Sequence, residues 1–177
     1  WPDEPTMAAL EAVPRPDVDG VRWTTPEQWH VTLRFCGRVA DEQVPDLAGA
    51  LRERLADRPA VEAVLGPSTA RLGTGVLHVP VAGLDALAAT VRAASAPFGD
   101  VHDDRPFLGH LTLARSGRGR HGRAADARAP RPRIPAALAG VEVGGSWPVG
   151  AVTVVSSTTR AGGPTYRVVA SVPLCGP

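Results

Sequence analysis

The chain has 177 residues, enough for one domain with a substantial buried core, and its 44% hydrophobic and 21% charged residues are typical of a globular protein. No apolar run approaches the roughly 20 residues that span a bilayer, and no signal peptide is recognisable, so we expect a cytoplasmic protein without membrane contact. Cys36 and Cys175 lack metal-binding spacing and are expected to be free thiols, as suits a reducing cytosol.

The net charge of +1 conceals one strongly basic stretch. Residues 105–133 contain eight Arg and a single acidic residue, a net charge of +7. A local field of this kind suits a polyanionic partner. Gly and Pro within 116–133 preclude a regular element, so we expect an Arg-rich loop that either contacts phosphates or is a solvated insertion.

The first elements are a short helix and a strand. Residues 4–13 carry apolar residues in helical register, and Pro14 and Pro16 follow them. Residues 21–24 are a plausible strand, and Pro26 breaks the chain after it.

A seven-residue motif at 29–35 comes next, and its alternation predicts a strand. Val31, Leu33 and Phe35 would then enter the core. The other face would carry His30, Thr32 and Arg34.

The middle of the chain alternates helices and strands. An apolar stripe predicts a helix over 41–58, and residues 84–96 are spaced for a second helix. Strand-like stretches lie between them at 61–65 and 75–81. Within the latter, His78 alternates with Leu77 and Val79 and is expected to be exposed or at the rim of a site.

A second copy of the motif occupies 109–115, after a loop at 102–106. Leu111 and Leu113 are expected to face the core of another strand, with His110 and Thr112 on its other face. Alternation would point Arg115 away from His110 unless the strand bulges. Two late strands, 151–156 and 166–172, are expected to form a hairpin.

Both motifs contain His-x-Thr-Leu, 80 residues apart, and similar elements precede and follow each. The duplication predicts one α+β domain over 1–177, made of two pseudo-symmetric antiparallel-sheet lobes with helices outside and a central cleft. Each lobe would present one His and one Thr to that cleft.

Two imidazoles on opposite sides of a substrate can act as general acid and general base, because the ordinary pKa of a histidine side chain is about 6.5. The neighbouring Thr hydroxyls could hold phosphate oxygens, and Arg115 could add positive charge. No Asp, Glu or Cys stands at ligand spacing within either motif, so we expect metal-free phosphoryl chemistry and no cofactor.

These residues resemble the two-histidine (2H) phosphoesterase superfamily, and within it the RNA 2′,3′-cyclic phosphodiesterase, or 2′-5′ RNA ligase (LigT-like), branch. The resemblance extends over nearly the whole chain. It rests on Val21-Arg22-Trp23, His30-Val31-Thr32-Leu33-Arg34-Phe35, Val76-Leu77-His78-Val79, Asp104-Arg105-Pro106-Phe107, His110-Leu111-Thr112-Leu113-Ala114-Arg115, Ser156 and Tyr166.

The resemblance implies hydrolysis of an RNA or nucleoside 2′,3′-cyclic phosphate to the 2′-phosphate, with 2′-5′ RNA ligation in the reverse direction and no obligate protein partner. By analogy His30 protonates the leaving oxygen and His110 accepts the proton of water, although the sequence leaves the two roles exchangeable. Thr32 and Thr112 complete the catalytic set. The residues implied in substrate binding are Arg34, Phe35, Arg115 and Tyr166.

The chain departs from the family pattern in two places. We expect the strand that usually precedes the position of Trp1 to be missing, and Leu108 and Gly109 stand where a basic or polar residue and a Pro usually precede the second motif. Gly109 is expected to loosen the approach to His110. The alternatives are a non-catalytic module that binds RNA ends, or a phosphodiesterase for 2′-5′ oligonucleotides or another cyclic phosphate.

Overall fold

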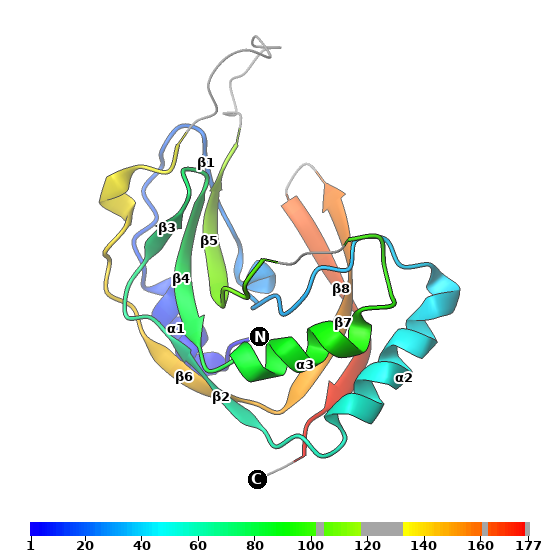
Figure 1. Cartoon of the computed structure of the whole chain (residues 1–177). Helices are drawn as coiled ribbons and strands as arrows, with labels where there is room; N and C mark the ends of the chain where they lie inside the picture. Colours follow the sequence, from blue (N-terminus) through cyan, green and yellow to red (C-terminus); the bar gives the residue numbers. More distant parts are fainter. Residues whose placement is uncertain (102–104, 118–132, 161–162, 176–177) are drawn as a thin grey trace. The chain divides into compact units, whose positions relative to one another are not determined.

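The computed structural model describes residues 1–101, 105–117, 133–160 and 163–175 (Figure 1). The α+β class predicted from the sequence is observed. The expected loop at 102–106 lies partly outside the described residues, and so does most of the expected Arg-rich loop. Within the described part of the chain, no helix is long and apolar enough to cross a membrane.

The chain forms two compact units, and neither corresponds to one half of the sequence. Unit 1 comprises Trp1–His30, Leu65–Pro80 and His110–Gly145, and unit 2 comprises Val31–Val64, Val81–Gly109 and Ser146–Pro177. The boundary therefore passes through the first motif. His30 belongs to unit 1 together with the second motif from His110 onward, whereas Thr32 belongs to unit 2.

Unit 1 begins with the predicted helix, α1, over Glu4–Glu11. The Asp3 carboxylate accepts a hydrogen bond from the Thr6 amide at 3.1 Å, which caps the first turn. Leu10 is fully buried near the other end of the helix. A short 3-10 helix, η3, covers Ala136–Leu138 later in the same unit.

The sheet of unit 1 is antiparallel and runs in the order β1-β5-β4, with β3 also paired to β4 (Figure 1). The strands are β1 Val21–Trp23, β3 Ala70–Leu72, β4 Val76–Ala82 and β5 His110–Ser116. Leu111 and Leu113 are buried, as the alternation of the second motif predicted. β3 is a short strand that no periodicity in the sequence indicated.

A β-bulge interrupts the pairing of β4 and β5. His78 pairs with Thr112, but the preceding Leu77 pairs with Ala114, so β5 holds one extra residue, Leu113. Leu113 and Ala114 are consequently both buried. The bulge reverses the alternation of every β5 residue that follows it.

The first motif does not form the predicted strand. The 3-10 helix η1, Pro26–Gln28, leads into it, and residues 29–35 lie in an irregular segment in which only Val31 makes a β-bridge. Phe35 is 65% exposed, so its predicted place in the core is wrong. Side-chain hydrogen bonds hold the segment instead of a strand ladder, starting with the indole of Trp29.

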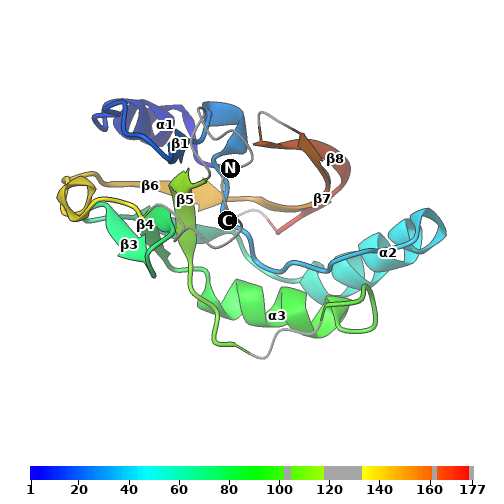
Figure 2. The same ribbon diagram turned by 90° about the horizontal axis from the view of Figure 1, so that it is seen from above.

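Unit 2 contains the two other helices, α2 Val44–Leu55 and α3 Asp85–Ser95, preceded in the case of α2 by the 3-10 helix η2 Asp41–Gln43. Both were predicted from their apolar stripes. The helices lie side by side in Figures 1 and 2, and α2 also packs against β8. Their buried faces are formed by Leu47, Ala48, Leu51, Leu55, Leu87, Ala88, Val91 and Ala94.

The predicted hairpin of unit 2 is confirmed and is longer than expected, with β7 over Ala151–Arg160 and β8 over Gly163–Pro173. The predicted strand β2, Val61–Leu65, neighbours β6, Gly145–Val149, which was not predicted. Trp147 of β6 is 4% exposed.

Gly109 does not loosen the chain before His110. Its carbonyl accepts a hydrogen bond from the Val81 amide at 2.9 Å, and a Cβ at Gly109 would lie 2.1 Å from the Val81 carbonyl oxygen. The absence of a side chain therefore allows two backbones to approach closely. The expectation that Gly109 loosens the chain before His110 is wrong, because Gly109 allows its backbone to pack closely against that of Val81.

Candidate functional site

His30 follows the buried Trp29 and is oriented by a local hydrogen bond. Its Nδ1 lies 2.9 Å from the Gln28 carbonyl oxygen. A carbonyl oxygen can only accept, so Nδ1 carries the proton of the neutral ring. Nε2 is then the ring nitrogen at which a proton can be gained or lost. The Trp1 ring packs against the imidazole, with centroids 5.6 Å apart.

His110 and Thr112 lie on β5, two residues apart on one face, as predicted. Their register partners on β4 are Pro80 and His78, which share that face because directly opposed residues of an antiparallel pair point the same way. The face is part-exposed at both motif residues.

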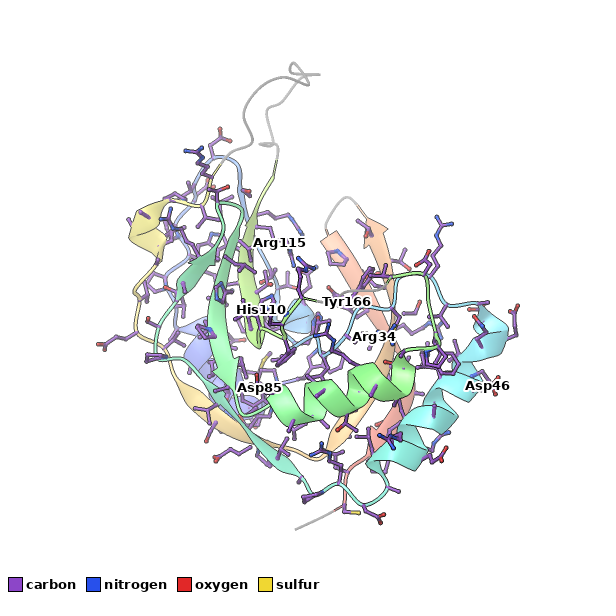
Figure 3. All side chains as sticks on the ribbon, in the orientation of Figure 1. Arg34, Asp46, Asp85, His110, Arg115 and Tyr166 are labelled. Carbon is purple, nitrogen blue, oxygen red and sulfur yellow. The ribbon has the colours of Figure 1, made fainter. Side chains whose placement is uncertain are left out.

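Arg115 lies on this same face because of the bulge. It pairs with Val76, which has the same parity on β4 as His78 and Pro80. Figure 3 shows the Arg115 and His110 side chains leaving β5 on one side. The sequence predicted that Arg115 would share the face of His110 only if the strand bulged, and the bulge is present. Arg22 of β1, directly opposite Arg115, joins the face as a second guanidinium that was not among the predicted site residues.

The electrostatics of His30 link it to the second motif. Burial lowers the pKa of His30, the hydrogen bond to Gln28 opposes this, and the charges of the amino terminus, Arg115 and His110, in that order, lower the pKa further. Such Coulomb interactions require proximity. Unit 1 thus contains His30 together with His110 and Arg115, which lie about 80 residues further along the chain.

A third imidazole lies beside His110. The His78 ring packs edge-to-face on that of His110, with centroids 5.5 Å apart and an interplanar angle of 79°. His78 is only 6% exposed, so of its two expected places, exposed or at the rim of a site, the first is wrong. Alternation misled here because β4 is covered on both faces: Leu77 and Val79 are also fully buried.

A buried hydroxyl, Thr24, connects the two motifs. The indole Nε1 of Trp29 donates to Thr24 Oγ1, and that hydroxyl lies 2.8 Å from the carbonyl oxygens of Thr112 and Leu113. One hydroxyl proton is shared between these two acceptors. The only hint of this in the sequence was that Thr24 precedes the motif by a few residues.

The other predicted site residues belong to unit 2. Thr32 is exposed, and Tyr166 is half-buried on β8 opposite Ser157. Arg34 donates from its guanidinium to Ser95 Oγ at 2.8 Å and to the Phe98 carbonyl at 3.1 Å, so it holds the end of α3. This contact gives Arg34 a structural role within unit 2.

Unit 1 combines three imidazoles that differ in environment, the Thr112 hydroxyl and two guanidinium groups. This set can donate and accept protons and can neutralise an anion, which is what displacement at a phosphate requires. Among the described residues no group of three or more His, Cys, Asp or Glu is placed to hold a metal ion.

Comparison with known proteins agrees with the motifs. Residues 7–159 match the model of the 2′-5′ RNA ligase superfamily. An RNA 2′,3′-cyclic phosphodiesterase from Thermus thermophilus is 32% identical over 195 residues, covering 99% of this chain and 87% of the relative.

Solved structures show the same fold. The crystal structure of TT0787 from Thermus thermophilus superimposes with a TM-score of 0.75 at 28% identity, covering 99% of this chain and 94% of that one. Escherichia coli LigT in complex with 3′-AMP gives a TM-score of 0.65 at 22% identity, covering 95% and 92%. The LigT-like α+β fold predicted from the sequence is thereby confirmed, and the chain belongs to the 2′-5′ RNA ligase superfamily.

Proposed function

We propose that the protein is an RNA 2′,3′-cyclic phosphodiesterase that hydrolyses the cyclic phosphate at an RNA end to a 2′-phosphate without a metal ion. The observation that carries the proposal is the face of β5 that His110, Thr112 and Arg115 share, in the same unit as His30. The activity named for the Thermus relative supports the choice of substrate.

In the proposed reaction, water attacks phosphorus and the bond from phosphorus to the 3′ oxygen breaks. His110 accepts the proton of the attacking water, and His30 gives its Nε2 proton to the departing 3′ oxygen. Thr112 and Arg115 bind the non-bridging oxygens, where charge-assisted hydrogen bonds stabilise the transition state. Each proton lost by the nucleophile is balanced by one gained by the leaving group.

The local hydrogen bond of His30 supports its part in this scheme. The Gln28 carbonyl keeps a proton on Nδ1 in both charge states of the ring, so that proton transfer occurs at Nε2. Burial lowers the pKa of His30 and makes its protonated form a stronger acid. A bound phosphate anion favours that protonated form in the complex.

The same groups suit ligation, in which a 5′-hydroxyl replaces water as the nucleophile and a 2′-5′ linkage forms without ATP. The superfamily description favours this second reaction.

Cys36 and Cys175 are both free thiols, as expected, which is compatible with the proposed cytosolic setting.

The test is turnover of a nucleoside 2′,3′-cyclic phosphate by the purified protein in the presence of EDTA, with the product identified by phosphorus NMR. We expect the 2′-phosphate at a rate that EDTA leaves unchanged. A 3′-phosphate product would contradict the direction of ring opening, and loss of activity on chelation would contradict the metal-free mechanism. Salt-dependent RNA binding without turnover would instead favour a non-catalytic module.

A further inference from the structure

His78 has an unusual environment for a polar side chain. Its Nδ1 is the one buried side-chain nitrogen or oxygen, in the part of the chain that the structure describes, that has no hydrogen-bond partner. Buried polar atoms are nearly always paired, because leaving one unpaired costs its full desolvation energy. An aromatic residue without nitrogen would fill the same space without that cost, so the imidazole calls for a functional explanation.

The position of His78 supplies one. It lies on the same face of β4 and β5 as Thr112, its register partner, and its ring contacts that of His110. The charged and titratable groups that share this face are His110 and Arg115 from β5 and Arg22 from β1, while β3 places only Ala70 opposite His78. A ligand bound at His110 therefore lies within reach of the His78 ring.

The two ring nitrogens of His78 differ in access. Nδ1 is enclosed and unpaired, whereas Nε2 is not among the enclosed unpaired atoms of the described residues. Placing the proton on Nδ1 would bury an unpaired N–H donor, so the neutral ring should carry it on Nε2. Burial, and then the charge of His110, lower the pKa of His78, which favours the neutral ring.

We propose that His78 is a substrate-binding residue: its neutral Nε2–H donates a hydrogen bond to a non-bridging oxygen of the phosphate held beside His110. The proposal rests on the proposed function for the identity of that phosphate. It assigns His78 no proton transfer, so its contribution is the same at every pH at which the enzyme works.

The first test is nitrogen-15 NMR of the histidine rings in the full-length protein, titrated with inorganic phosphate and with a nucleoside 2′-phosphate. We expect a neutral His78 with the proton on Nε2, and a shift of the Nε2 resonance on addition of either anion. A proton on Nδ1, or a His78 resonance that neither anion moves, would overturn the proposal.

The second test uses two substitutions. His78→Phe keeps the ring and its contact with His110 but removes the donor, and His78→Gln keeps a donor but removes the ring. For His78→Phe we expect kcat/KM to fall by about 10-fold, as for loss of one hydrogen bond to a charged group, with both limbs of the pH profile retained. His78→Gln should recover part of the activity.

The stability of His78→Phe distinguishes a substrate-binding role of His78 from a structural one. Because His78→Phe removes an unpaired buried nitrogen, Tm should rise while activity falls. Unchanged activity in His78→Phe, with wild-type turnover intact, would overturn the inference and leave the proposed function standing. A wild-type protein that does not turn over the cyclic phosphate, but whose His78 resonance shifts with phosphate, would overturn the proposed function and support the anion contact.

Discussion

The indole N–H of Trp29 donates a hydrogen bond to the hydroxyl of Thr24, at 3.0 Å, in the interior of unit 1. Thr24 in turn bonds the backbone of β5 at the bulge, since its amide also donates to the Leu113 carbonyl at 2.8 Å. Trp29 immediately precedes His30, and Leu113 follows His110 by three residues. A single threonine thus fixes the backbone next to both histidines.

Replacing Thr24 with Val tests this link, because Val has nearly the same shape but no hydroxyl. The Trp29 N–H would lose its acceptor in a buried position, so we expect the free energy of unfolding to fall by about 1–3 kcal/mol. Activity should fall beyond what stability explains, since both histidines lose a constraint. Thr24→Ser, which retains the hydroxyl, is the matched control. Urea unfolding and turnover of folded protein would measure the two effects, and equal activity of both variants would contradict the role.

Gly109→Ala tests the close approach before His110. A Cβ at this position would lie 2.1 Å from the Val81 carbonyl oxygen, which belongs to backbone and cannot rotate away. We expect the Gly109–Val81 hydrogen bond to break and the thermal midpoint to fall. Gly73→Ala is unsuitable as a control, because Gly73 has a positive φ of 59° that strains any residue with a side chain. A Cβ at Gly49, in contrast, meets no atom within 4 Å. Gly49→Ala is therefore the control, and a Gly109→Ala protein as stable as Gly49→Ala would refute the steric argument.

Removal of either imidazole tests the acid–base pair. General acid and base groups typically contribute about 10²–10⁴ in rate, so His30→Ala and His110→Ala should each reduce kcat by that order. Thr112→Ala should cost less, because it removes one hydrogen bond and no proton transfer. Near-ultraviolet circular dichroism would establish that each variant is folded. A folded His110→Ala protein with more than about a tenth of wild-type turnover would be incompatible with the mechanism.

The second motif shows what a sequence can predict. Alternation correctly placed Leu111 and Leu113 in the core and His110 and Thr112 on the other face, because a strand in a sheet repeats every two residues. The same rule failed for the first motif, whose alternating apolar residues suggested a strand. There Trp29 alone is fully buried, while Phe35 is exposed, since the segment is held by side-chain hydrogen bonds.

Two features of the site depend on contacts between distant segments and left no local pattern. The bulge at Leu113 decides the side on which Arg115 lies, and it arises from the register of β5 against β4. His78 is buried because both faces of β4 are covered, which no alternation within one strand can reveal. The paired motifs identified the chemistry, whereas the third imidazole and the Thr24 link required the structure.

The pH dependence of stability should report the buried histidines. Burial lowers the folded-state pKa of both His30 and His78 below the usual value of about 6.5. Below that pH the unfolded chain binds more protons than the folded one, so the free energy of unfolding should decrease as the pH falls from about 7 towards the folded pKa values. Urea unfolding at several pH values would measure this decrease. The free energy of unfolding of His78→Phe should decrease less steeply than that of wild type. Identical slopes for the two proteins would contradict a lowered folded-state pKa of His78.

Arg115→Gln can decide which histidine is the acid. Burial is the main cause of the lowered pKa of His30, and the charge of Arg115 adds to it, so removing that charge should raise the pKa of His30. The pH profile of kcat/KM reports the free enzyme, and its alkaline limb marks loss of the proton from the general acid. If His30 is the general acid, the alkaline limb should move to higher pH. If the acidic limb moves instead, His30 is the general base and His110 the general acid.

Arg71→Gln provides the matched control for this experiment. Arg71 lies on β3 opposite Leu77, on the other face of the sheet from Arg115, and carries the same charge. Its removal changes the net charge equally but leaves the surroundings of His30 intact, so neither limb should move. If Arg71→Gln moved a limb as far as Arg115→Gln, the shift would reflect the overall charge, and the local coupling of Arg115 to His30 would be disproved.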